Sequence, residues 1–140
     1  MEMGYEIKLI IGRDTGRKED DCDYSTTPPR KSGKKCTYFM EYAMIDLCKL
    51  AYDGVFHKAM GSWRNKDENH FWFKYEANDR RLIEDCYGEK WIPQKISVVL
   101  DVLKQELAND PDYRRLKWAV ALLESMKDDA EDLCVWVYGY

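Results

Sequence analysis

Apolar and polar residues alternate at the start of the chain. Within Tyr5–Ile11 every second residue is apolar, as a half-buried strand requires. The end of the chain, Leu133–Tyr138, is apolar almost throughout and also predicts a strand. An isolated strand leaves its backbone groups unpaired. We therefore expect the last strand to join a sheet beside the first, which would bring the two chain ends together.

The middle of the chain holds two further apolar segments. Cys36–Leu50 predicts a strand in its first half, whereas Ala43–Ala51 fits a strand or a helix equally, because short apolar runs are ambiguous. His70–Tyr75 is aromatic and alternating, and it predicts another strand. Between them, His57–Asn69 shows no clear period, and we expect it to be irregular.

Helical signals follow in the second half of the chain. Asn78 can cap a helix that Gly88 ends, and Pro93 can occupy the first turn of the next helix. Two apolar stripes then recur at a spacing of three to four residues, and together they predict an antiparallel helical hairpin over Pro93–Met126. The stripes are Ile96, Val99, Leu100, Leu103 and Leu107, and then Leu116, Ala119, Val120, Leu123 and Met126.

The segment 12–35 is polar and rich in turn residues. An acidic run, Glu19–Asp23, is followed by Thr26–Pro29 and then by a basic run of Arg30, Lys31, Lys34 and Lys35. We expect a long polar loop here. A loop of this length is uncommon inside a compact domain, and it indicates either function or disorder.

These elements predict the fold class. The expected architecture is α+β, with a small, mainly antiparallel sheet packed against the C-terminal helical hairpin. A length of 140 residues, with 45% hydrophobic residues, suits one compact domain over 1–140. Apolar residues left over on both helices also suggest a homodimer. They are Val98 and Val102 on the first helix, and Trp118 and Leu122 on the second.

Charge and cysteine content limit the partners and the compartment. The net charge of −4 makes a nucleic-acid partner less favoured, since such binders usually carry a basic surplus. No run of apolar residues is long enough to span a bilayer, so we expect no membrane association. Five cysteines, an odd number, and a start without a signal-peptide pattern predict reduced thiols and a cytoplasmic location.

Signatures of catalysis and of metal binding are weak. Asp21–Ser25 resembles the opening of a calcium loop, but Thr26 stands where that loop needs glycine. The two histidines, His57 and His70, would form an acid–base pair only if the fold brought them together. We therefore assign no catalytic residue, no metal ligand and no cofactor.

Aromatic residues next to cationic residues are the most distinctive feature of the sequence. Such rings suit stacking on a base, or an interface with a protein. We expect Trp118 and Trp136 to be core residues. The candidate binding residues are Trp63, Arg64, Trp72, Lys74, Arg80 and Arg81, together with the basic run of Arg30, Lys31, Lys34 and Lys35.

Three functions are compatible with these features. The first is a small non-catalytic protein that binds or inhibits a macromolecular partner, most simply a protein. Virus-encoded inhibitors of host machinery are similar in size and composition, an analogy that carries no residue-level argument. The second is a small-molecule or nucleotide binder with an aromatic and cationic pocket. The third is a hydrolytic enzyme that uses His57 or His70.

Overall fold

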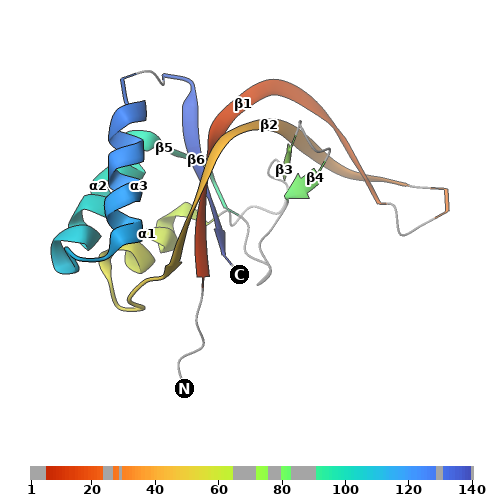
Figure 1. Ribbon diagram of the computed structural model, residues 1–140. Coiled ribbons are helices and arrows are strands. Elements are labelled where there is room, and N and C mark those ends of the chain that lie inside the picture. The colour runs from red at the N-terminus through yellow and green to blue at the C-terminus, as the bar shows by residue number, and fades with distance from the viewer. Residues whose placement is uncertain are drawn as a thin grey trace.

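The computed structural model describes most of the chain, and Figure 1 shows its helices gathered on one side of a sheet. The described residues are 6–23, 27–28, 30–64, 72–75, 80–82, 91–128 and 131–139. Within these, the structure gives the backbone alone for 18–23, 30–38, 72–75 and 80–82.

The sheet has six strands in the order β4-β3-β2-β1-β6-β5. β2 and β3 are parallel, and the other neighbouring strands are antiparallel. The predicted α+β class with a mainly antiparallel sheet is confirmed, and so is the pairing of the last strand with the first. The strands are β1 (Glu6–Asp23), β2 (Arg30–Lys49), β3 (Trp72–Tyr75), β4 (Arg80–Leu82), β5 (Gln94–Lys95) and β6 (Leu133–Gly139).

The core lies between the sheet and the helices. β1 turns Ile7, Leu9 and Ile11 toward the helices, and all three are fully buried. The predicted C-terminal helical pair is confirmed, and its buried faces are the predicted stripes. The helices are α1 (Val55–Trp63), α2 (Ile96–Asn109) and α3 (Arg114–Met126).

The segment 12–35, expected to be a polar loop, is mostly strand. β1 continues to Asp23 and β2 begins at Arg30, so the two strands form a long hairpin that arches away from the helices (Figure 1). Acidic positions on β1 face basic positions on β2, with Asp20 opposite Lys35. Gly12 permits close strand contact, since a Cβ there would lie 2.0 Å from the Met40 carbonyl oxygen. The backbone pairing of β1 with β2 therefore continues through a segment whose sequence shows no apolar alternation.

Two local expectations need correction. The region expected to be irregular contains α1, which buries Phe56, Met60 and Trp63 at helical spacing. The helix expected between Asn78 and Gly88 is wrong over β4, because those residues pair with β3. Residues 83–88 of that helix lie outside the described residues.

Two positions around these elements are also settled by the structure. Ala43–Lys49, ambiguous from the sequence, is strand, because it pairs with the buried part of β1. Pro93 lies before the short strand β5 and not in the first turn of α2, which begins at Ile96.

Candidate functional site

The predicted pair Trp63 and Arg64 lies at the end of α1. Trp63 is only 4% exposed and packs edge-on against Phe56, with ring centroids 5.4 Å apart. The guanidinium of Arg64 lies over a different ring, 5.5 Å from the centroid of Trp91. Trp63 is thus a core residue. No sequence pattern pairs Arg64 with Trp91, because only the fold brings the two residues together.

The other predicted binding residues lie on three neighbouring strands. They are Trp72 and Lys74 on β3, Arg80 and Arg81 on β4, and Arg30, Lys31, Lys34 and Lys35 on β2. Lys74 faces Arg81 across one strand pair, and Cys36 of β2 faces Trp72 across the next. The pairing thus brings the positions of β3 and β4 together, beside Cys36–Phe39 of β2, while Arg30 and Lys31 pair with the far end of β1. Their side chains lie outside the described residues, so their binding role stays a prediction.

His57 is half-buried on α1, where its ring stacks on Tyr52 with centroids 4.9 Å apart. Burial lowers the pKa of His57, and the negative charge of Glu106 acts in the opposite direction. His70 lies outside the described residues. The expected meeting of the two histidines therefore stays a prediction.

Glu106 is a buried carboxylate with a structural partner. It is 5% exposed, and its Oε2 accepts a hydrogen bond of 3.0 Å from the backbone N–H of Val55, at the start of α1. Gly54 allows this approach, because a Cβ there would lie 2.5 Å from Oε1 of Glu106. A cavity of about 400 Å³ adjoins the carboxylate, and its lining includes Lys49, Asp53 and Tyr113. Glu106 thus caps α1 from another helix.

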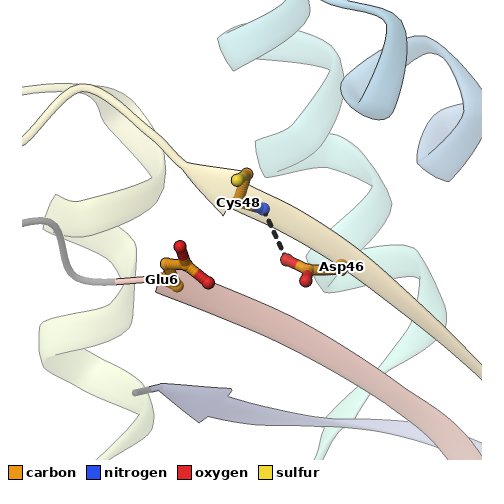
Figure 2. Close-up of side chains that lie close together, drawn as sticks. All are labelled: Glu6, Asp46 and Cys48. Atoms are coloured by element: carbon orange, nitrogen blue, oxygen red, sulfur yellow. Dashed lines mark hydrogen bonds between the residues drawn. The ribbon is translucent and has the colours of Figure 1, made fainter.

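Figure 2 shows a second polar cluster, where the start of β1 meets the end of β2. Glu6, Asp46 and Cys48 each have one potential metal-ligand atom, and these atoms lie within 4.8 Å of one another. The backbone N–H of Cys48 donates to Asp46 at 2.7 Å, and Arg115 lies 3.9 Å from the same carboxylate. The described residues supply three ligands, whereas a structural zinc site uses four. The sequence hid this cluster because Glu6 is remote from the other two residues along the chain.

The outer side of β2 meets α3 near this cluster. Tyr113 donates its hydroxyl proton to the carbonyl oxygen of Leu47. Arg115 donates from Nη1 to the carbonyl oxygen of Asp46 at 2.9 Å. Two side chains at the start of α3 therefore satisfy two backbone groups at the outer edge of β2.

Exposed apolar side chains lie on either side of this contact. Trp118 on α3 is 60% exposed, which corrects the expectation that it is a core residue. On β2, Tyr42 and Met44 are 54% and 51% exposed, and the Tyr42 hydroxyl accepts a hydrogen bond from Arg13. Trp136, in contrast, is 1% exposed, as expected.

Comparisons with known proteins give no further assignment. No family model matches the chain, no curated protein is detectably similar to it, and no solved structure resembles it. Within the described part of the chain, no helix has the length and hydropathy to span a membrane.

Proposed function

We propose that this chain is a non-catalytic cytosolic protein that acts by binding, and thereby occluding, a protein partner. The exposure of Trp118 carries the proposal. Trp63, Trp91 and Trp136 are each at most 4% exposed, whereas Trp118 leaves most of its ring in water at 60%. Tryptophan is enriched among the residues that dominate binding energy at protein interfaces.

The surroundings of Trp118 support a protein interface. Arg114, Arg115 and Lys117 are all exposed on the first turns of α3. Arginine is enriched at protein interfaces together with tryptophan. Tyr42 and Met44 are further exposed apolar side chains, on the strand β2 that Arg115 contacts. We refer to Tyr42, Met44, Arg115 and Trp118 below as the α3–β2 surface.

Charge favours a protein over a nucleic acid as the partner. The chain carries a net charge of −4. The basic positions at the start of β2 do not stand alone, since Lys35 faces Asp20 and Arg30 faces Asp23. A nucleic-acid site normally needs an unopposed set of cations that neutralises phosphates.

Affinity capture from a lysate of the source cell tests the proposal. The baits are the wild-type chain, Trp118→Glu on the α3–β2 surface, and Val98→Glu as a matched control at an exposed apolar position of α2. Circular dichroism checks that each bait is folded. We expect a protein that the wild type and Val98→Glu retain and that Trp118→Glu loses. Equal capture by all three baits, or recovery of a metabolite without any protein, would contradict the proposal.

A further inference from the structure

The cavity beside Glu106 lies between two connections of the chain. One joins β2 to α1, and the other joins α2 to α3. Its volume of about 400 Å³ is in the range of small-molecule sites. Leu50 and Leu116 are buried and give it an apolar wall. Its exposed polar lining residues are Lys49, Asp53, Asn109 and Asp110.

Glu106 uses one of its two carboxylate oxygens within the protein. Oε2 accepts the N–H of Val55, whereas in the described part of the chain Oε1 accepts no hydrogen bond. Oε1 is not fully enclosed either, and since Glu106 lines the cavity, this oxygen is reached from there. A carboxylate that is 5% exposed is costly to bury unless its charge is paired. The cavity thus contains a buried acceptor that can take a further donor.

The cations near Glu106 do not neutralise it. Lys49 is the one cation among the described lining residues, and it forms no ion pair with the cavity carboxylates. His57 is also near Glu106, but burial lowers the pKa of His57 below its ordinary value of 6.5. Its ring is therefore neutral near pH 7, and the charge of Glu106 is not offset from that side.

The lining as a whole is negative. Asp53, Glu106 and Asp110 supply three carboxylates against the single ammonium of Lys49. Asp110 stands at the C-terminal end of α2, which is the negative end of the helix dipole. The positive end of α1 faces the cavity too, but Glu106 already binds the N–H of Val55 there. The cavity therefore complements a cation and disfavours an anion.

The spacing of the carboxylates favours an organic cation over a metal ion. Among the described residues, the one group of three potential ligand atoms within 4.8 Å of one another is that of Glu6, Asp46 and Cys48. The cavity carboxylates therefore do not converge on a single ion. The apolar wall suits an aliphatic stem, since the stems of amines such as lysine bury well along apolar surface.

We propose that this cavity binds a small aliphatic amine, whose ammonium group pairs with Oε1 of Glu106 while its stem packs against Leu50 and Leu116. In a diamine, the second ammonium group meets the carboxylates of Asp53 and Asp110 at the rim. No residue of the α3–β2 surface lines the cavity, so this site is separate from that surface and does not depend on the proposed function.

Titration of the full wild-type chain with putrescine, a linear diamine, tests the proposal. The readout is the amide NMR spectrum at constant ionic strength and near neutral pH. We expect saturable shifts of the Gly54 and Val55 signals, because these residues adjoin Glu106. Butylamine has a single ammonium group and should bind more weakly. Butanol and butyrate, which lack a positive charge, should cause no saturable shift.

Variants of the lining identify the group that binds the amine. Glu106→Gln keeps an oxygen for the N–H of Val55 but removes the charge, and it should weaken putrescine binding about tenfold. Asp101→Asn removes one charge from an exposed position of α2 outside the cavity and should leave binding unchanged. Lys49→Gln removes the opposing cation and should strengthen binding about twofold.

A second acidic variant covers the case in which Glu106→Gln does not fold. Asp110→Asn changes an exposed side chain at the rim and should weaken putrescine binding about twofold to threefold, with little change for butylamine. Circular dichroism checks that each variant is folded.

Several outcomes would overturn the proposal. They are the absence of saturable shifts at Gly54 and Val55, equal putrescine binding by wild type and a folded Glu106→Gln, and binding of butyrate or of Mg²⁺ in place of the amine. Binding of Nα-acetyl-lysine methylamide without binding of putrescine would identify a lysine side chain of a protein as the source of the ammonium group, and would overturn the free amine. None of these readouts involves Trp118, so the proposed function stands or falls separately.

Discussion

The two halves of the β1–β2 hairpin reach the same backbone pairing by different means. Next to the helices, β1 pairs with β6 as well as β2 and buries Ile7, Leu9 and Ile11. From Asp14 to Asp23 it pairs with β2 alone, and Asp20 and Asp23 face Lys35 and Arg30. We call these the inner and outer halves. Hydrophobic alternation thus reports which face of a strand is buried, not whether the strand is paired.

The largest expected effect separates the two halves within one strand. Leu9 is fully buried in the inner half, so Leu9→Ala should lower the free energy of unfolding by about 2–5 kcal/mol. Arg17 is exposed in the outer half, and Arg17→Ala should change it by less than about 0.5 kcal/mol. Urea denaturation measures both. Similar losses of unfolding free energy in Leu9→Ala and Arg17→Ala would contradict the distinction between the two halves.

Replacing Glu106, the buried carboxylate of α2, should lower the free energy of unfolding somewhat less than Leu9→Ala does. Glu106→Ala leaves the Val55 N–H without its acceptor, at a cost of about 1–3 kcal/mol in the free energy of unfolding. Glu106→Gln keeps an acceptor oxygen and should cost less. Thermal or urea denaturation of both variants measures these losses. Equal stability of Glu106→Ala and wild type would show that Glu106 does not stabilise the start of α1.

Lowering the pH should reduce the free energy of unfolding by a smaller amount, through His57 on α1. Burial holds the pKa of His57 in the folded chain below the ordinary value of 6.5. As pH falls below 6.5, the unfolded chain therefore binds a proton before the folded chain does, and the free energy of unfolding decreases. This contribution is fully present above pH 6.5 and is lost as pH falls through the folded pKa.

The variant His57→Gln isolates that contribution. Urea midpoints measured between pH 7.5 and pH 5 should fall more steeply for wild type than for His57→Gln. Parallel pH profiles would show that His57 does not carry the effect.

The smallest effect concerns the charged positions of the outer half. Asp20→Lys places like charges at facing positions, opposite Lys35, and should cost about 0.2–1 kcal/mol. The double exchange Asp20→Lys with Lys35→Asp restores opposite charges and should recover the loss. A double variant as unstable as the single variant would argue against cross-strand charge matching.

Burial patterns made part of the fold predictable from sequence. Alternation identified the start of β1, and a continuous apolar run predicted β6. Helical spacing identified α2 and α3, because each helix buries one face. Segment 12–35 was missed as strand because its sequence shows no apolar alternation. β4 was missed because pairing with β3 outweighs the local helical signal of Asn78 and Gly88.

The candidate surface was harder to predict. Trp63, chosen for its neighbouring cation, is buried, while Trp118, expected to be a core residue, is exposed. The exposure of Trp118 agrees with its position outside the apolar stripe of α3, whereas the contacts of Tyr113 and Arg115 with β2 exist only in three dimensions.

Amide hydrogen exchange at residues 43–45 of the free protein tests most directly how β2 is paired next to the helices. The register with β1 is regular here, so the N–H groups of Ala43 and Ile45 point to one side of β2 and that of Met44 to the other. Among the described strands only β1 borders these residues, so one of the two sets should exchange slowly and the other much faster. Equal protection of all three amides would mean that both sides of β2 are paired there, which would contradict the account.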